Sequence, residues 1–156
     1  MSFGLSIDPG TNATGLCVWV DGWPVRLVTI RTVTKNDRLC YETKRQLLHE
    51  NLVVQIDKLI EEFGPLQRVA IEDFIPRTVG AKVNNIQKLY KTVGTIEALL
   101  WERYKVQPKR ICKGRAPKEE ARWLAVYYKL MGPGSTLDSR DALHVGCLAG
   151  FAREQR

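Results

Sequence analysis

The stretch Phe3-Gly4-Leu5-Ser6-Ile7-Asp8-Pro9-Gly10 opens the chain with an apolar run that ends on a carboxylate and then turns. An apolar run of this kind predicts a strand from Phe3 to Ile7, buried between neighbouring strands. Asp8 then lies where the backbone is held rigidly while its side chain emerges at the strand end. We expect the rest of the chain to be arranged around this carboxylate.

Length and composition indicate the number of domains and the general class of the protein. The chain has 156 residues, 44% of them hydrophobic, so we expect one domain over residues 1–156 with a core of its own. No apolar run approaches the ~20 residues that span a bilayer, and no N-terminal basic region precedes an apolar stretch and cleavage site, so we expect a soluble, unprocessed protein. Four separated cysteines and two histidines predict free thiols in a reducing compartment rather than zinc or disulfides.

The order of patterns along the chain predicts an α/β fold. Asp21-Gly22 is typical of a hairpin turn between two strands, so the first three strands form an antiparallel meander. Apolar positions at helical spacing, ended by Gly64-Pro65, predict a long helix that covers the sheet. We therefore expect a mixed five-stranded sheet flanked by helices. The later strands are expected at 15–20, 25–33, 68–72 and 106–112, and the helices at 38–63, 83–104, 116–130 and after Ser135-Thr136.

A second carboxylate follows the same design as the first. The strand Arg68-Val69-Ala70-Ile71-Glu72 hides its apolar side chains and ends on an acid. If the two strands are parallel neighbours, their ends lie about 5 Å apart, close enough for Asp8 and Glu72 to hold one cation. The alternative is that Glu72 is simply an exposed acid at a strand end.

Two more acids lie at the start of the last predicted helix. Asp138 and Asp141 are three residues apart, which places both on one face of the first turn. Asp138 has a structural alternative, because an acid at a helix start caps the helix or complements its dipole. Asp141 precedes a tightly packed apolar face, where a carboxylate is costly unless a positive charge compensates it. Our functional hypothesis is that all four acids converge.

Four converging carboxylates suit hydrolysis of a phosphodiester. Two cations about 4 Å apart can both activate a water and offset the charge on the leaving oxygen. Hard oxygen ligands predict Mg²⁺, with Mn²⁺ as a substitute, at two ions per site. Asp8 would bridge the ions, Glu72 would hold one, and Asp138 with Asp141 the other. Lys118 could offset developing charge, or it could be a solvated lysine at a helix start.

Basic residues crowd two segments of a chain whose formal net charge is +7. Each phosphate that a lysine or arginine neutralises releases counterions, so such clusters favour a nucleic acid partner. The alternative, a merely solvated basic face, is common. The candidate DNA-binding residues in these segments are Arg77, Lys82, Lys109, Arg110, Lys113, Arg115 and Lys118.

The predicted helix from Val83 to Tyr104 carries more apolar surface than one core face requires. Gly94 and Ala98, four residues apart, would let another backbone approach closely. We expect this helix to form much of a homodimer interface. Deep burial within one subunit is the alternative.

Three motifs together resemble those of RuvC-type Holliday junction resolvases. They are Ile7-Asp8-Pro9-Gly10-Thr11 with Thr14-Gly15, then Ala70-Ile71-Glu72, and then Leu137-Asp138-Ser139-Arg140-Asp141-Ala142-Leu143, in the family's order and spacing. The resemblance implies an RNase H-like fold, a homodimer, and a Mg²⁺-dependent nuclease that cuts two strands of a four-way DNA junction symmetrically.

The same resemblance implies roles for particular residues. It makes Asp8, Glu72, Asp138 and Asp141 the metal-binding acids, and it places Lys109 and Lys118 near basic positions used on DNA. Phe74 falls in the region that contacts the unpaired centre of the junction. The segments 74–82 and 113–118 depart from the common bacterial pattern, so a phage or organellar relative with a broader substrate range is the alternative to a bacterial enzyme. We expect a cytoplasmic location in a bacterial or phage-infected cell, with an organelle as the alternative.

Other classes of protein share some of these features. Asp8-Pro9-Gly10-Thr11 is also typical of actin-like and sugar-kinase-like phosphotransferases, but those need a second lobe that 156 residues cannot supply. A module that binds branched DNA without cutting it would gain nothing from carboxylates facing phosphates. An RNase H acting on RNA/DNA hybrids is the alternative within the nuclease class.

Overall fold

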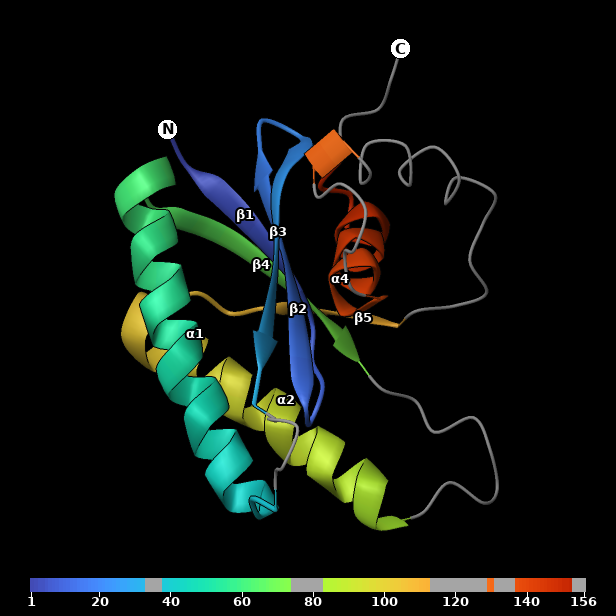
Figure 1. The fold of residues 1–156 in the computed structure, drawn as a ribbon. Coiled ribbons are helices and arrows are strands. Elements are labelled where there is room, and N and C mark those ends of the chain that lie inside the picture. The colour runs from blue at the N-terminus through green and yellow to red at the C-terminus, as the bar shows by residue number, and fades with distance from the viewer. Residues whose placement is uncertain (33–37, 74–82, 113–128, 131–136, 153–156) are drawn as a thin grey trace.

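The computed structural model describes residues 1–32, 38–73, 83–112, 129–130 and 137–152 (Figure 1). The predicted helix over residues 116–130 therefore lies almost entirely outside the described residues. The elements in chain order are β1 (Phe3–Asp8), β2 (Ala13–Val20), β3 (Trp23–Arg31), α1 (Tyr41–Phe63), β4 (Leu66–Asp73), α2 (Val83–Tyr104), β5 (Lys109–Cys112) and α4 (Leu137–Leu148).

The five strands form one mixed sheet in the order β3-β2-β1-β4-β5. β1 pairs with β2, and β2 with β3, in antiparallel register, whereas β4 runs parallel to both β1 and β5. The predicted fold class, with its meander of three strands followed by two further strands, is confirmed. β1 is the central strand, so its end is held by a neighbour on each side.

Local turn chemistry explains how the meander and the long helix end. Asp21 and Gly22, with φ of 50° and 82°, form the turn between β2 and β3, as their residue types predict for a two-residue hairpin. Gly64 follows α1 with a φ of 86°, and its N–H donates to the carbonyl of Ile60 at 3.0 Å. Both turns use positive φ angles, which glycine adopts without strain.

The side chains of the sheet alternate between two apolar layers. Phe3, Leu5 and Ile7 of β1 join the larger core cluster, which α1 and α2 complete. The opposite face includes Cys17 and Trp19 of β2, and it packs against α4. Figure 1 shows α1 and α2 on one side of the sheet and α4 on the other. Because side chains alternate along a strand, Ser6 and Asp8 belong to the side of α4.

Element boundaries differ from the predicted ones by a few residues. β2 begins at Ala13 rather than Gly15, because Ala13 pairs with Arg31 across the hairpin. β5 begins at Lys109 rather than Val106, at the residue that pairs with Ala70. α1 begins at Tyr41 rather than Arg38, whereas α2 has the predicted bounds. The limits of a strand depend on its pairing with another strand, and a local sequence pattern carries no information about that pairing.

Among the described residues, no helix combines the length and the apolar character that crossing a bilayer would require.

Candidate active site

Two of the predicted acids emerge side by side at the carboxyl ends of β1 and β4. Ile7 and Ile71 are register partners in the parallel pair, so Asp8 and Glu72 each follow one residue later on adjacent strands. Neighbouring strands are about 4.8 Å apart. Both acids are partly buried. By alternation from Ser6 and Ala70, both belong to the face of the sheet that α4 covers.

A buried hydrogen-bond chain fixes α4 against the central strand. Ser6, which is fully buried, donates from Oγ to the carbonyl of Ala142 at 2.6 Å. The same Oγ accepts a hydrogen bond from the indole Nε1 of Trp19 at 2.8 Å. Ser6 therefore ties β1, two residues before Asp8, to α4, next to Asp141.

A glycine lets the first turn of α4 approach the sheet beside Asp8. Gly15 of β2 is the register partner of Asp8. A Cβ on Gly15 would lie 2.0 Å from the carbonyl oxygen of Asp138 and 2.9 Å from the backbone N of Ser139. Only a glycine fits this approach. The backbone of Asp138 therefore lies against the residue that pairs with Asp8, and α4 also contacts β4.

The ends of β1 and β4 and the backbone at the start of α4 thus lie at one end of the sheet. Asp138 and Asp141, at the start of α4, are partly buried like Asp8 and Glu72. Among the described residues, however, no three carboxylate, imidazole or thiol side chains are gathered closely enough to hold a metal ion together. The role of the four acids as metal ligands therefore stays a prediction. Their donor chemistry fits the predicted ion, because carboxylate oxygens are the ligands that Mg²⁺ and Mn²⁺ prefer.

The loop that follows Asp8 is held in place by short-range hydrogen bonds. Thr14 Oγ1 accepts from the N–H of Gly10 and donates to its carbonyl, both at 3.3 Å. The N–H of Thr32 donates to the carbonyl of Asn12 at 3.0 Å. A Cβ on Gly10 would lie 2.1 Å from the carbonyl oxygen of Ala13, so a larger residue does not fit there. Hydrogen bonds and close packing therefore fix the conformation of the turn after β1 and the direction in which the chain leaves Asp8.

Two solved structures are similar to this chain over nearly its whole length. RuvC from Thermus thermophilus matches with a TM-score of 0.67 and 17% identity, over 96% of this chain and 93% of that one. The chain has a RuvC-like, RNase H-like fold. T. thermophilus RuvC in complex with a Holliday junction substrate matches with a TM-score of 0.64 and 16% identity, over 97% and 94% of the two chains. No family model and no curated protein sequence matches the chain, so the likeness to RuvC is one of fold.

The basic residues predicted to bind DNA have different surroundings in this RuvC-like fold. Lys109 is exposed on β5. Its neighbour Arg110 bonds through Nη2 to Glu97 at 2.6 Å and lies 3.8 Å from Asp73, so it takes part in an intramolecular charge cluster. The other predicted DNA contacts and the predicted catalytic lysine lie outside the described residues. These are Phe74, Arg77, Lys82, Lys113, Arg115 and Lys118.

Asp73 and Ser6 are not among the residues that the sequence predicts for the site. Asp73 directly follows Glu72 at the end of β4, and that adjacency is the signal that could have drawn attention to it. Ser6 interrupts the apolar run of β1, and a polar residue at a fully buried strand position indicates a specific partner. That partner, the carbonyl of Ala142, is 136 residues away along the chain.

The predicted interface helix divides into a buried and an exposed side. Val93, Ile96 and Leu100 are buried in the core shared with α1 and the sheet. The opposite side leaves Tyr90 and Trp101 exposed at 45% and 55%. The smaller residues Gly94 and Ala98 are exposed between them. The alternative, burial within one subunit, therefore holds for one side of α2, whereas the exposed stripe leaves apolar surface uncovered. A homodimer stays a prediction.

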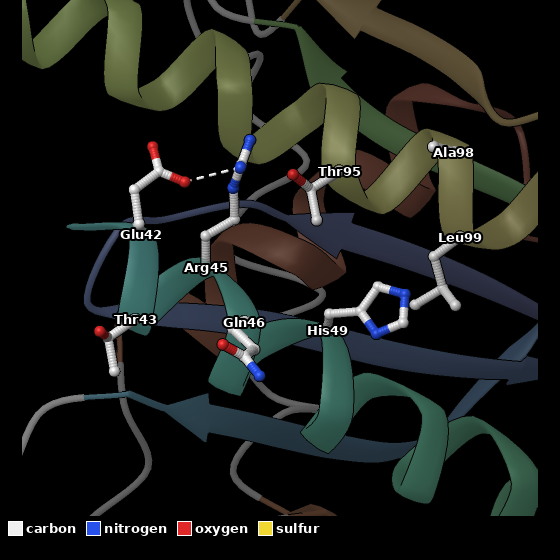
Figure 2. Close-up of a pocket in the computed structure, with 8 residues that line it drawn as sticks. All are labelled: Glu42, Thr43, Arg45, Gln46, His49, Thr95, Ala98 and Leu99. Carbon is white, nitrogen blue, oxygen red and sulfur yellow. Dashed lines mark ion pairs between the residues drawn. The ribbon is translucent and has the colours of Figure 1, made fainter. Parts of the chain in front are cut away.

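Two cavities of about 530 Å³ border α1 and α2. One lies between the helices, with His49, Thr95, Ala98 and Leu99 along its length (Figure 2). At its other end Glu42 and Arg45 form an ion pair at 2.6 Å. None of the four acids of the candidate site lines it. The second cavity adjoins the loop after Asp8 and is lined by Gly10, Thr11, Asn12, Leu39, Tyr41, Lys44, Asn85, Lys88 and Leu89.

Proposed function

We propose that this protein is a metal-dependent, structure-selective endonuclease that resolves four-way DNA junctions by paired symmetric nicks, in recombination or the processing of branched DNA. One observation carries the proposal: the ends of β1 and β4 and the start of α4 bring Asp8, Glu72 and the Asp138–Asp141 pair to one end of a RuvC-like sheet. The similarity in fold to RuvC in complex with a Holliday junction substrate supports the choice of substrate.

The proposed metal ligands are Asp8, Glu72, Asp138 and Asp141. Two Mg²⁺ ions, or Mn²⁺ in their place, would supply charge stabilisation at the attacking and leaving oxygens. Asp8 suits the bridging position because it ends the central strand, where β2 and β4 restrain its backbone on both sides. Lys118 is the proposed catalytic lysine, with its ammonium group offsetting negative charge at the scissile phosphate.

The protein's own contribution is to place these groups before the substrate arrives. The hydrogen bond from Ser6 to Ala142 fixes the distance between α4 and β1. Because Gly15 has no side chain, the start of α4 can approach the sheet closely. Charge development in the reaction is best stabilised by groups that need not reorganise. A rigid strand end and a pinned helix start meet that requirement.

The proposed partners are branched DNA and a second copy of the chain. A four-way junction with two-fold symmetry is best cut by a two-fold dimer, which places two sites on strands of like polarity. The exposed stripe of Tyr90, Gly94, Ala98 and Trp101 on α2 is the proposed interface. Lys109 and the basic segments beyond the described residues would bind the phosphates of the arms.

The test is cleavage of an end-labelled synthetic four-way junction, with Mg²⁺ and with EDTA, by the wild type and by Asp8→Asn. A gel-shift assay of the same proteins measures binding. We expect paired symmetric nicks that need the metal and disappear in Asp8→Asn, with junction binding retained.

Other outcomes point to the alternative functions. Binding with no metal-dependent cut would indicate a module that recognises branched DNA. A protein that cuts neither strand of the junction but cleaves an RNA/DNA hybrid duplex would be an RNase H-type nuclease. Cleavage that survives in Asp8→Asn would contradict the proposed site.

A further inference from the structure

The second cavity lies where three separate elements meet at the end of the central strand, on the side of the sheet that α1 and α2 cover. Gly10, Thr11 and Asn12 come from the loop after β1, Tyr41 and Lys44 from the start of α1, and Asn85, Lys88 and Leu89 from the start of α2. Gly10 is two residues beyond Asp8. A molecule in this cavity would therefore lie next to the end of the central strand.

The described lining of this cavity suits an anion that carries further polar and apolar groups. Two lysines, Lys44 and Lys88, line it, and no described lining residue is acidic. Neither lysine forms an ion pair with a described carboxylate. Asn12 and Asn85 add amide groups that can both donate and accept hydrogen bonds. Leu39, which is 42% exposed, and Leu89 add apolar surface.

Hydrogen bonds between the three elements hold the cavity open in one shape. Lys44 Nζ donates to Asn12 Oδ1 at 2.9 Å, which joins α1 to the loop. The Tyr41 hydroxyl donates to the carbonyl of Lys88 at 2.6 Å and lies 2.9 Å from Thr92 Oγ1, which joins α1 to α2. These contacts link residues 32, 47 and 51 positions apart in sequence. The cavity is therefore a product of the tertiary fold rather than of one flexible loop.

The size of the cavity is informative about its ligand. At about 530 Å³ it falls within the range of sites that hold small organic molecules, about 300–1,000 Å³, and it far exceeds the need of a single phosphate. A nucleotide has the matching parts: a phosphate for the lysines, a base edge for the amides and a base face for the leucines.

We propose that this cavity binds one nucleotide of a DNA strand, next to the phosphodiester that the acids would cut. The inference deepens the proposed function and rests on it for the identity of the substrate. Lys44 and Lys88 bind the phosphate, and the amides of Asn12 and Asn85 contact the base. The cavity thus positions the strand, and it provides a way for the identity of a base to influence cleavage.

The experiment measures binding of a fluorescent single strand of about 12 nucleotides in EDTA, so that no cleavage occurs. The variants are Lys44→Gln and Lys88→Gln in the full chain. Lys58→Gln is the matched control, because Lys58 is an exposed lysine of the same helix, about 21 Å along α1 from Lys44. Lys88→Gln keeps the test valid if loss of the Lys44–Asn12 contact disturbs the loop.

We expect each cavity variant to weaken binding about fivefold at 0.1 M salt and to flatten the plot of log affinity against log salt by about 0.7. Lys58→Gln should bind like the wild type. Equal binding by both cavity variants and the wild type, or an equal loss in the control, would overturn the inference. So would a wild type that binds no single strand, or one whose bound strand is displaced as readily by inorganic phosphate as by unlabelled DNA.

A second arm separates this inference from the proposed function. The same proteins are titrated with a four-way junction and with a linear duplex of the same sequence. A wild type with no preference for the junction, whose cavity variants still lose the single strand, would contradict the junction-resolving function and leave the nucleotide site standing. A wild type that prefers the junction, with variants that bind the single strand as well as the wild type does, would contradict the nucleotide site and leave the junction-resolving function standing.

Discussion

At the scale of single residues, the position of α4 depends on two small side chains in the sheet. Ser6 links β1 to the carbonyl of Ala142 and accepts from Trp19, and all of this is buried. Gly15 gives the backbone of Asp138 room to approach. A third small residue, Gly146 of α4, lies where a Cβ would be 2.4 Å from the indole of Trp19. Close approach of α4 to the sheet therefore requires specific residues rather than apolar character alone.

Replacing Ser6 should lower stability. Ser6→Ala leaves the indole N–H of Trp19 buried without its acceptor, and a buried unsatisfied donor costs about 1–3 kcal/mol. Urea unfolding followed by tryptophan fluorescence measures the loss. Ser2→Ala is the control, since the hydroxyl of Ser2 makes an exposed hydrogen bond to Gln67 at 3.0 Å and its removal should cost little. Equal effects of the two substitutions would show that the buried bridge is unimportant.

Replacing Gly15 should separate the acids. The Cβ of Gly15→Ala would overlap the carbonyl oxygen of Asp138, so the first turn of α4 must move away from Asp8. We expect junction cleavage to fall at least tenfold while gel-shift binding is retained. Asn51→Ala is the control, because Asn51 is an exposed residue of α1 outside the candidate site and the proposed interface. Full cleavage activity in a folded Gly15→Ala protein would contradict the proposed placement of Asp138.

At the scale of elements, α1 and α2 are joined at both ends of their contact. Near their N-termini the Tyr41 hydroxyl reaches Lys88 and Thr92. Near their C-termini Tyr104 donates to Asp57 at 2.8 Å, and Arg103 pairs with the same carboxylate at 2.7 Å. This pair of helices forms the layer that closes the larger core and borders both cavities.

The Tyr104 contact predicts a loss of stability at alkaline pH. Burial, and then the hydrogen bond to Asp57, raise the pKa of Tyr104 from 10.0 to about 12. Because the folded state holds this proton more tightly than the unfolded chain, the contribution is complete below pH 10 and is lost as the pH rises to 12. Urea unfolding of the wild type and of Tyr104→Phe should show a steeper decline in the wild type across this interval. An identical decline in Tyr104→Phe and in the wild type would contradict the assignment.

The exposed stripe of α2 can be tested at Gly94. A side chain there meets nothing within the subunit, and replacing a glycine inside a helix favours the helix by about 0.5–1 kcal/mol. Gly94→Gln should therefore keep or raise the melting temperature while it separates the proposed dimer. Sedimentation velocity of the wild type and the variant measures the association. A Gly94→Gln protein that stays dimeric would exclude close packing at this position. Val93 and Ile96 are unsuitable for the same test, because both are buried in the core of one subunit.

At the scale of the whole molecule, charge is distributed unevenly between free and paired groups. The chain has a formal net charge of +7. The guanidinium group of Arg110, however, is already paired within the chain with the carboxylates of Glu97 and Asp73. Lys109, one residue earlier on β5, is exposed and forms no ion pair with the described acids. The net charge alone therefore overstates the number of basic side chains that are available to bind phosphates.

This difference predicts how salt should act on two neighbouring variants. Lys109→Gln should flatten the plot of log affinity for a junction against log salt by about 0.9, the loss of one phosphate contact. Arg110→Gln should change the slope less, because its guanidinium group is already neutralised by Glu97. Fluorescence anisotropy titrations at several salt concentrations measure both slopes. A larger change for Arg110→Gln would mean that DNA displaces the internal ion pair.

The sequence by itself determined the elements and the chemistry that they carry. Apolar runs, a hairpin dipeptide and a glycine stop are local signals, so the strand that ends at Asp8, the strand that carries Glu72 near its end, the meander and the bounds of α2 follow from short windows. The four acids lie at or near the ends of elements that are otherwise rich in apolar residues.

Only the tertiary structure decided how these elements meet. The parallel register of β1 and β4, the bridge from Ser6 to Ala142, the pairing of Arg110 with Glu97 and the cavity beside Gly10 each join residues distant in sequence. Such contacts depend on which surfaces fit together after burial, and a local pattern of residue types holds no information about the partner. The chain therefore encodes its reactive groups locally, whereas their mutual placement is a property of packing.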